Sequence, residues 1–449
     1  MNACGFIRQR LFFHRMYKRI LIANRADCAL RLIRACRDLG IQTVAIAARD
    51  DDTNAIAQTA DRIVYTGFSR DAYTSQNDIL EAARHENCEA LLPGWGFLSE
   101  NPAFAQKCRA CGCHFVGPST RQLQLFGDKL QTIRTLEHAF NPPQHPAIAC
   151  DHPHLNHWID TNDGPWMLKN RFGGGGKGIY LVDARRDLDQ KLQSLCASKQ
   201  LSHYYIEKAC TSQGTRHIEF QFFGDGKGRV SLVGARDCTP QVHHQKWLEK
   251  SISLSSAPEL LQIATGIQAV LQTMHYQSWG TVEFLRAPDG VCQLLELNPR
   301  LQVEHGVTEM AANVDLVRAA IELSCYRQMD LPDLPRDDGE AIEFRLIALK
   351  SGTIQHIGFE GCTWPDHPCR DNPDYRIESA VMPNTRISGV YDGLCARFIV
   401  RAQNDALSRL KSWLKTFKIE GIPTTLDNLI TGRSTGSPGE TSDRLPSTF

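Results

Sequence analysis

The residues best suited to chemistry lie in a β-hairpin expected in the second half of the chain. Two runs rich in β-forming residues, Thr281–Leu285 and Val291–Leu297, flank Asp289-Gly290, a pair favoured in two-residue hairpin turns. A two-residue turn makes Pro288 face Val291. Counting outward, the same register predicts one glutamate on each strand directly opposite the other.

The two facing glutamates, Glu283 and Glu296, indicate a metal site. Carboxylates opposite each other in a ladder repel and destabilise the pair, and a divalent cation removes that cost. Hard oxygen ligands, with the amide of Asn298 nearby, suit Mg²⁺ or Mn²⁺. Beyond the hairpin, polar and apolar residues alternate, so an extended segment has one polar and one buried face. A solvated edge hairpin is the alternative, and the strict alternation argues against it.

Length and composition narrow the class of protein. The 449 residues leave room for about three domains. Lysine plus arginine and aspartate plus glutamate number 50 each, so the net charge favours neither a nucleic-acid nor a membrane partner. No apolar run approaches the roughly 20 residues of a membrane span. The 16 cysteines lack disulfide-like spacing, which favours a reducing cytosol.

Three short segments need separate interpretation. The cluster Cys108, Cys111, Cys113 and His114 lacks a second Cys/His pair at finger spacing, so we interpret it as buried thiols. Met1–Met16 is arginine-rich and acid-poor, as in a mitochondrial presequence. Its shortness favours an upstream start ahead of Met16 and a cytoplasmic protein. From Thr431 onward the Gly/Ser/Thr/Pro-rich composition predicts disorder.

The first unit, about Tyr17–Pro118, alternates strands and helices, which predicts an open, mostly parallel α/β sheet. The expected strands are Arg19–Ala23, Gln42–Ala47, Ile63–Tyr65, Ala90–Leu92 and His114–Val116, and the expected helices are Ala29–Leu39, Ser75–His85 and Pro102–Cys111. Asn24–Asp27 stands where a dinucleotide-binding protein has its Gly-x-Gly-x-x-Gly motif, which disfavours a dehydrogenase.

The second unit, about 141–208, contains the glycine run Gly173–Gly178. The run is not a Walker loop, because Arg171 replaces its first glycine. It joins the strand-like runs Trp166–Lys169 and Ile179–Val182, so we expect a mobile hairpin tip. Glycine N–H groups can close over phosphates while Lys169 supplies charge. A simple flexible loop is the alternative.

The third unit begins near Arg216 and contains the metal hairpin. It also holds the polar run Arg236–Lys246 and a strand-like run, Ala341–Ala348, that includes Arg345. The apolar spacing in Ala402–Thr416 predicts a helix.

From about Lys18 to Asn428 the chain resembles biotin carboxylase of the ATP-grasp superfamily. The motifs that carry the resemblance are Ile22–Arg25, Gly94–Asn101, Phe115–Pro118, Gly127–Lys129, Gly173–Gly178, Arg236–Cys238, His244–Lys246, Asn298–His305 and Val307–Met310. The resemblance implies an α/β and α+β ATP-grasp fold. The expected parts are a 1–16 extension, an open parallel α/β domain at 17–140, a mobile glycine-rich lid domain at 141–210, a catalytic domain at 211–335, a mixed-sheet C-terminal domain at 336–430 and a disordered tail at 431–449.

The resemblance also implies the reaction. ATP phosphorylates bicarbonate to carboxyphosphate, and biotin delivered on a biotin carboxyl carrier protein is then carboxylated. A carboxyltransferase subunit uses the product and decides which carboxylase system is served. The chain has no Met-Lys-Met sequence, so the carrier is a separate protein. A homodimer is implied, with no nucleic-acid or membrane partner.

Residue roles follow from the resemblance, position by position. The ATP-binding positions are Lys129, Lys169, Gly175, Gly176, Glu207, Lys208, Ala209, Cys210, His217, Gln241, His244, Glu283 and Glu296. The expected magnesium ligands are Glu283, Glu296 and Asn298. Bicarbonate falls to Lys246, Arg300 and the backbone of Val303, Glu304 removes the bicarbonate proton, and Arg345 stabilises the biotin enolate.

The chain departs from the family pattern mainly on the biotin side. Ile347–Lys350 replaces an Asn-Ala-Glu-Asp-Pro loop after Arg345, and single departures occur at Ala26, Asp27, Leu92, Phe172, Lys177, Gly306, Gly393 and Arg397. Two alternatives therefore stay open. One is another ATP-grasp ligase that activates a carboxylate, and the other is a catalytically impaired binding subunit.

Overall fold

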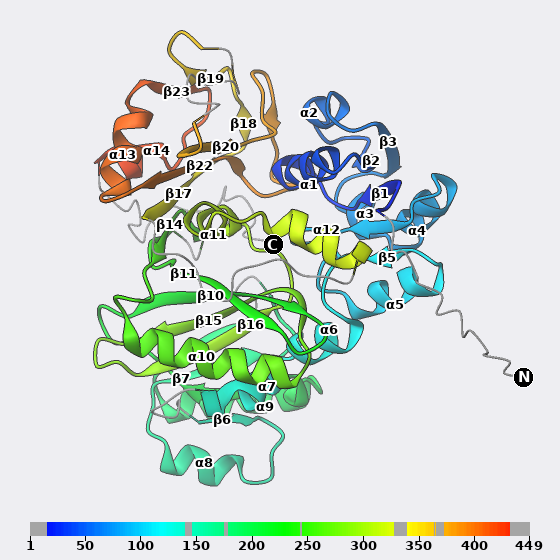
Figure 1. Ribbon diagram of the computed structural model, residues 1–449. Helices are drawn as coiled ribbons and strands as arrows, with labels where there is room; N and C mark the ends of the chain where they lie inside the picture. Colours follow the sequence, from blue (N-terminus) through cyan, green and yellow to red (C-terminus); the bar gives the residue numbers. More distant parts are fainter. Residues whose placement is uncertain are drawn as a thin grey trace, which may run out of the picture.

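The N-terminal unit of the computed structural model is a parallel α/β sheet, as predicted (Figure 1). The model describes residues 16–139, 146–174, 178–242, 245–326, 339–362, 364 and 372–431. The strand order is β3-β2-β1-β4-β5, and the pairs are parallel. The strands are β1 (Arg19–Ile22), β2 (Gln42–Ala48), β3 (Arg62–Gly67), β4 (Ala90–Leu92) and β5 (His114–Phe115).

The helices of this unit also follow the sequence closely. They are α1 (Ala26–Asp38), α2 (Asn54–Ala57), α3 (Asp71–Thr74), α4 (Gln76–His85), α5 (Pro102–Ala110), α6 (Thr120–Phe126) and α7 (Lys129–Leu136), followed by the 3-10 turn η1 (Glu137–Ala139). Helix α1 begins three residues earlier than predicted and ends before Gly40, whose φ is 69°. That left-handed conformation suits glycine and ends the helix.

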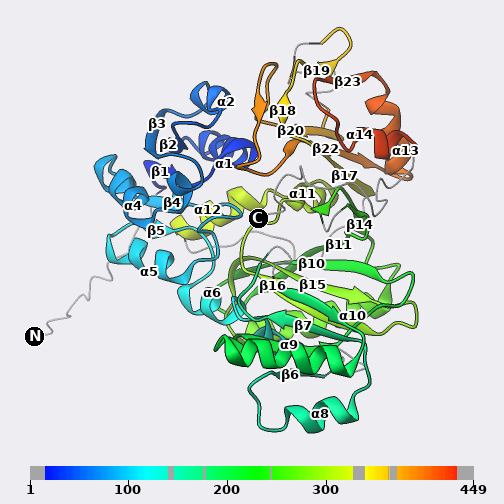
Figure 2. The same cartoon turned by 180° about the vertical axis from the view of Figure 1, so that it is seen from behind.

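A second, four-stranded sheet, called here the lid sheet, contains the predicted glycine-run hairpin. Its order is β6-β9-β7-β8, with β6 (Ala147–Ala149), β7 (Trp166–Asn170), β8 (Ile179–Val182) and β9 (Tyr204–Lys208). Helices α8 (Leu155–Thr161) and α9 (Arg185–Ala197) and the turn η2 (Leu201–His203) complete it. Figure 2 shows α8 at the end of the molecule remote from the C-terminal unit. Gly175, Gly176 and Lys177 lie outside the described residues.

The largest sheet is antiparallel, has eight strands and carries most of the candidate site. Its order is β16-β15-β10-β11-β14-β17-β22-β20. The strands are β10 (Arg216–Asp225), β11 (Val230–Asp237), β14 (Leu248–Ile252), β15 (Gln277–Arg286), β16 (Cys292–Asn298), β17 (Glu340–Ile347), β20 (Tyr375–Glu378) and β22 (Leu394–Ala402). The short pair β12 (Gln241–Val242) and β13 (Gln245–Lys246) lies beside it.

The two faces of this sheet differ in chemistry. On β10, Ile218, Phe220 and Phe222 join a core with α10 (Pro258–Thr273) and α7. The alternate residues of β10 point to the other face, where α11 (His305–Ala312) packs on β11 and β17. Helix α12 (Leu316–Tyr326) connects this part to α1 through a shared core. Period-2 alternation therefore puts the polar side chains on the face turned to the site.

The C-terminal unit packs small elements on β17 and β22. These are β18 (Gly352–Thr353), β19 (His356–Phe359), β21 (Arg386–Ile387), β23 (Phe417–Glu420), α13 (Ala406–Trp413), η3 (Leu414–Thr416) and α14 (Leu426–Thr431). The predicted helix Ala402–Thr416 is wrong at its start. Ala402 ends β22, and Asp405 caps α13 by accepting a hydrogen bond from the Ser408 N–H, which fixes the later start.

The predicted hairpin exists, but its turn is different. The Ala287 N–H donates to the Val291 carbonyl at 2.8 Å, so Ala287, not Pro288, faces Val291 across a three-residue loop. This shift would misalign the glutamates by one position. A bulge between Glu283 and Phe284 restores the register, and Glu283 does pair with Glu296. β-bulges re-aim side chains in this way beside functional sites.

Two further expectations can be checked on the described residues. Among the described residues, no helix combines the length and the apolar character needed to cross a membrane. Cys108 and Cys113 are buried, and burial raises the pKa of Cys113 to about 12. Cys111 is exposed, so the buried-thiol interpretation is wrong for that residue. Residues 1–15 and the tail after Thr431 lie outside the described part.

Candidate active site

A cavity of about 910 Å³ opens between the N-terminal sheet, the lid sheet and the eight-stranded sheet. Twelve of the residues selected from the sequence line it: Lys129, Lys169, His217, Gln241, Lys246, Glu283, Glu296, Asn298, Arg300, Val303, Glu304 and Arg345. They come from seven separate segments, so the fold brings together residues that lie far apart in the sequence. Gly175, Gly176 and His244 lie outside the described residues.

Glu283 is the most heavily bonded carboxylate of the hairpin. Its Oε1 accepts hydrogen bonds from Asn298 Nδ2 at 2.6 Å and Gln302 Nε2 at 2.7 Å. Its Oε2 accepts from His217 Nε2 at 2.9 Å and from Lys246 Nζ at 3.2 Å. Burial alone would raise the pKa of Glu283, but Lys246 and His217 outweigh it and hold that pKa well below the usual range.

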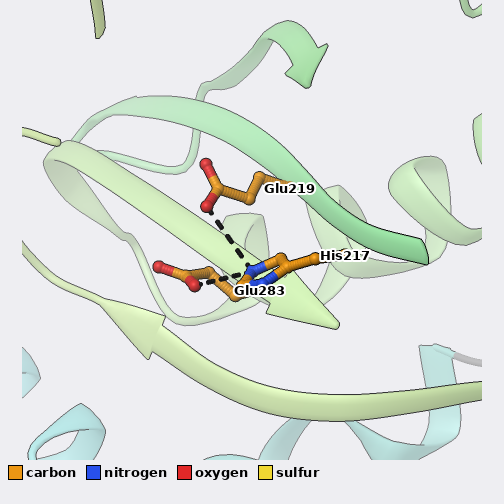
Figure 3. Close-up of side chains that lie close together, drawn as sticks. All are labelled: His217, Glu219 and Glu283. Carbon is orange, nitrogen blue, oxygen red and sulfur yellow. Dashed lines mark hydrogen bonds and ion pairs between the residues drawn. The ribbon is translucent and has the colours of Figure 1, made fainter. Parts of the chain in front are cut away.

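The hydrogen bonds of His217 define its tautomer. Gln241 Nε2 donates to the Cys238 carbonyl at 3.1 Å, which orients the amide, and lies 3.0 Å from His217 Nδ1. Nδ1 is therefore the acceptor, and the proton on Nε2 points at Glu283 (Figure 3). The imidazole can thus donate to an oxyanion without first being protonated.

Glu219 belongs to the same cluster and was missed in the sequence. It pairs with Glu283 across β10 and β15, and ligand atoms of His217, Glu219 and Glu283 lie within 4.8 Å of one another (Figure 3). Glu219 is fully buried and accepts two hydrogen bonds from Arg236, from Nε at 3.1 Å and from Nη2 at 2.9 Å. The signal was available: polar His217, Glu219 and Gln221 alternate with apolar residues along β10.

The two facing carboxylates fit a hard divalent cation. Glu283 and Glu296 face each other from neighbouring strands. Burial would raise the pKa of Glu296, but Lys129 and Asn298 outweigh it and lower that pKa. Lys129 Nζ contacts Glu296 and Asn298 Nδ2 bridges both carboxylates. Lys129 and Asn298 therefore contact the same carboxylate oxygens that would bind magnesium. Carboxylate oxygen is the kind of ligand that magnesium prefers.

Lys246 lies between Glu283, an expected magnesium ligand, and Glu304, the expected base. Its ammonium contacts Glu219, lies 3.2 Å from Glu283 Oε2 and lies 2.9 Å from Glu304 Oε1. Burial opposes the charge on Lys246, but the surrounding glutamates overcome it and raise the pKa of Lys246 well above its usual value. Lys246 is therefore a permanent cation in the middle of the cavity.

Arg300 has donor capacity left for an anion. Its Nη1 donates to Gln302 Oε1 at 2.7 Å and its Nη2 to Asn298 Oδ1 at 3.2 Å. Its Nε is buried and has no hydrogen-bond partner among the described residues, and Glu100 Oε1 lies 3.5 Å away. An unmet buried donor favours a ligand oxygen. The alternation predicted for residues 298–304 is met only in part: Asn298, Arg300, Gln302 and Glu304 line the cavity, but so does Val303, and β16 ends at Asn298.

Arg345 lies at the deep end, among acids. Its Nη2 lies 2.7 Å from Glu304 Oε2 and 2.5 Å from Glu249 Oε1, and its Nε lies 3.8 Å from Glu343 Oε1. Burial would raise the pKa of Glu304, but Lys246 and Arg345 hold it well below the usual range. Glu304 is therefore ionised and able to accept a proton, though its cation partners make it a weak base until a ligand displaces them.

Behind Arg345, two carboxylates face each other. Glu249 and Glu343 are directly paired across β14 and β17, and both are fully buried. Burial raises the pKa of Glu343 to about 7, although Arg397 and Arg345 oppose the shift. Burial likewise raises the pKa of Glu249. Protonation of one of the two carboxyls would relieve the repulsion between them.

This pair makes stability depend on pH. The pKa of Glu343 is 4.5 when exposed and about 7 in the fold, so the folded protein holds an extra proton between these values. Stability should fall as pH rises through that window, by about 3 kcal/mol or less. Denaturant unfolding from pH 5 to 8 should show a smaller fall for Glu343→Gln than for the unmodified protein. Equal slopes would contradict the protonated pair.

The expected ATP-binding residues Glu207–Cys210 lie on and after β9 of the lid sheet. Lys169 Nζ contacts Glu207, which is 1 % exposed. The Lys208 carbonyl accepts from Gln293 Nε2 at 2.9 Å, and the Ala209 N–H donates to the Pro165 carbonyl at 2.8 Å. None of the segment Glu207–Cys210 lines the cavity, although Glu207 contacts Lys169, which does.

Comparisons with known proteins agree on one family. The model of the biotin carboxylase N-terminal domain matches residues 16–123, and that of the carbamoyl-phosphate synthase L chain ATP-binding domain matches 133–331. The biotin carboxylase C-terminal domain model matches 347–431. The 2-oxoglutarate carboxylase small subunit of Hydrogenobacter thermophilus is 34 % identical, with 92 % of this chain and 89 % of the relative covered.

Further relatives point the same way. The biotin carboxylase of Nostoc sp. is 33 % identical, covering 91 % of this chain and 94 % of its own. A crystal structure of the biotin carboxylase domain dimer of the Hydrogenobacter thermophilus enzyme, with MgADP and bicarbonate, superposes with a TM-score of 0.82 at 32 % identity over 93 % of this chain and 94 % of that one. A biotin carboxylase–β,γ-ATP complex from Campylobacter jejuni has a TM-score of 0.82 at 28 % identity, covering 92 % and 94 %. The chain therefore belongs to the biotin carboxylase family, ATP-dependent ligases with the ATP-grasp fold.

Proposed function

We propose that this chain carboxylates biotin on a separate carrier protein, using ATP and bicarbonate through carboxyphosphate. One observation carries the proposal. At one end of a single cavity, the carboxylates of Glu283 and Glu296 face each other beside lysine side chains. Toward the other end lie Arg300, Glu304 and Arg345, and Arg345 contacts Glu304. Phosphoryl transfer needs the first group and anion activation needs the second.

The nucleotide end consists of Lys129, Lys169, His217 and the metal pair. Magnesium held by Glu283, Glu296 and Asn298 would neutralise negative charge between the phosphates. Lys129 and Lys169 each sit against a glutamate in this structure, and the phosphates would replace those carboxylates as partners. We assign Gly175, Gly176 and His244 to the same phosphates by family resemblance, with Glu207–Cys210 holding the adenine.

The bicarbonate end consists of Lys246, Arg300 and the Val303 backbone. Arg300 can present its free Nε and one more donor to a planar anion. A bicarbonate oxygen then attacks the γ-phosphorus as the bond to ADP breaks, and Glu304 accepts the bicarbonate proton. Glu304 lies 2.9 Å from Lys246, so the base and the anion-binding cation are already adjacent.

Biotin would be activated beside Arg345. Carboxyphosphate breaks down to carbon dioxide and phosphate, the phosphate takes the proton of the ureido nitrogen, and that nitrogen then attacks carbon dioxide. Arg345 stabilises the negative charge that develops on the ureido oxygen. The cavity wall next to Arg345 is formed by Ile347 and Leu394, which gives the ring an apolar surface.

We further propose that the protein works as a homodimer with a biotin carboxyl carrier protein and a carboxyltransferase subunit. The Hydrogenobacter thermophilus relative was crystallised as a biotin carboxylase domain dimer, and its full name calls it a small subunit. The dimer supports the homodimer, and the subunit name supports a separate partner subunit.

Phosphate release from ATP tests the proposal against its alternatives. The account predicts release that depends on bicarbonate and increases with free biotin. Stimulation by a different carboxylate would identify another ATP-grasp ligase. Tight ATP binding without turnover would identify a binding subunit, and either result would overturn the proposal.

A further inference from the structure

The carbonyl of Val303 is held from behind by groups outside the active-site cluster. Arg397 Nη1 donates to this carbonyl at 2.5 Å, and His305 Nδ1 lies 2.8 Å from the Gln302 carbonyl and 3.2 Å from the Val303 carbonyl. Burial lowers the pKa of His305 to about 3, so its ring is neutral and Nδ1 carries the single proton as a donor. The Trp95 ring lies against both partners, 5.7 Å from the His305 ring and 5.2 Å from the Arg397 guanidinium.

Arg397 is in turn fixed by Asp27. Arg397 Nε lies 2.9 Å from Asp27 Oδ2, and the two residues are 0 % and 8 % exposed. Asp27 is on α1 of the N-terminal sheet, Arg397 is on β22 of the eight-stranded sheet, and Val303 precedes α11. One buried ion pair therefore joins three parts of the chain behind the bicarbonate end.

We propose that Asp27 and Arg397 are positioning residues that fix where the backbone of Val303 and Glu304 lies in the anion site. The inference rests on the proposed function for its kinetic meaning. The peptide group whose carbonyl Arg397 grips leads directly into Glu304, so a shift of that carbonyl moves the base. The same shift moves the Val303 N–H assigned to bicarbonate. Asp27 touches neither group and acts through Arg397 alone.

The guanidinium geometry lets Arg397 contact both partners at once in this chain. Arg397 uses Nε for Asp27 and Nη1 for Val303, two nitrogens held apart in one rigid plane. A lysine has a single nitrogen at the end of a flexible stem, so it cannot satisfy both partners in this geometry. Arg397→Lys therefore keeps the buried positive charge but releases one of the two contacts.

Arg397→Lys should raise the KM for bicarbonate by about tenfold or more, because a misplacement of about 1 Å can cost up to a hundredfold. The KM for MgATP should change little, whereas the melting temperature should fall, because a contact of a fully buried guanidinium is lost. Arg401→Lys is the matched control, since Arg401 lies on the same strand and contacts the Met310 carbonyl at 3.5 Å, outside the cavity. Equal rises in both KM values would overturn the inference.

Asp27→Asn provides a second variant from the other end of the pair. It should raise the same KM by a smaller factor, and the double variant should be no worse than Arg397→Lys, because Asp27 acts through Arg397. Additive effects would contradict that order of action.

Hydrogen exchange separates this inference from the proposed function. Without any ligand, backbone amides between residues 299 and 306 should exchange faster in Arg397→Lys and unchanged in Arg401→Lys. Unchanged exchange in Arg397→Lys overturns the positioning role, even in an enzyme that uses bicarbonate. An unmodified protein without bicarbonate-dependent ATP cleavage overturns the proposed function instead.

Discussion

Replacing Glu296 with glutamine should lower magnesium-dependent ATP cleavage more than about a hundredfold while the fold stays intact. The loss follows because a carboxylate that clamps the metal contributes several kcal/mol to transition-state stabilisation. The substitution keeps the shape of the side chain and the hairpin register, so the far-ultraviolet circular dichroism should not change. The measurement is initial phosphate release at saturating bicarbonate across a magnesium titration.

Glu259→Gln is the control for this experiment. Glu259 pairs with Arg286 at the end of the same hairpin, and its side chain is 74 % exposed, so its loss should leave turnover unchanged. Near-normal turnover in Glu296→Gln would remove the metal pair from the mechanism. A loss in both variants would point to damage of the hairpin.

Replacing Arg345 and replacing Arg300 should have different effects on the two half-reactions, ATP cleavage and carboxybiotin formation. Arg345→Gln should keep bicarbonate-dependent ATP cleavage yet lose carboxybiotin formation by about a hundredfold, because a fixed cation helps most where charge develops. Arg300→Gln should lose both activities, since its guanidinium holds the planar anion common to both steps. The measurement compares phosphate release with carboxybiotin yield for each variant.

Glutamine is chosen at position 345 because its amide can still donate a hydrogen bond to the buried Glu304 carboxylate, a donor that alanine would remove. Arg401→Gln, on the neighbouring strand β22 and outside the cavity, is the control. Equal loss of ATP cleavage in Arg345→Gln and Arg300→Gln would contradict the division of roles.

The hairpin shows how far sequence reasoning reaches. Period-2 alternation fixed which side chains share a face, and the facing of Glu283 and Glu296 is confirmed. The turn was wrong because Asp289-Gly290 propensity is local, whereas the loop and the compensating bulge are set by packing of the whole strand pair. The one-residue error in the predicted turn and the one-residue bulge cancel each other. The predicted pairing of Glu283 with Glu296 is therefore right although the predicted turn is wrong.

The candidate site contains a part that no local pattern specifies. Glu219 faces Glu283 only because β10 and β15 are neighbours, and neighbours in a sheet are a tertiary property. The Arg397–Val303 contact likewise joins residues far apart in sequence. Spacing can show that His217, Glu219 and Gln221 share one face, but not what that face meets.

Transfer of labelled carbon from bicarbonate to biotin tests the central claim most directly. The unmodified protein, given MgATP, radiolabelled bicarbonate and free biotin or a biotinylated carrier protein, should form an acid-labile carboxybiotin whose amount matches the ATP cleaved above the biotin-free background. Ordinary ATP cleavage with no labelled biotin under any of these conditions would contradict the account.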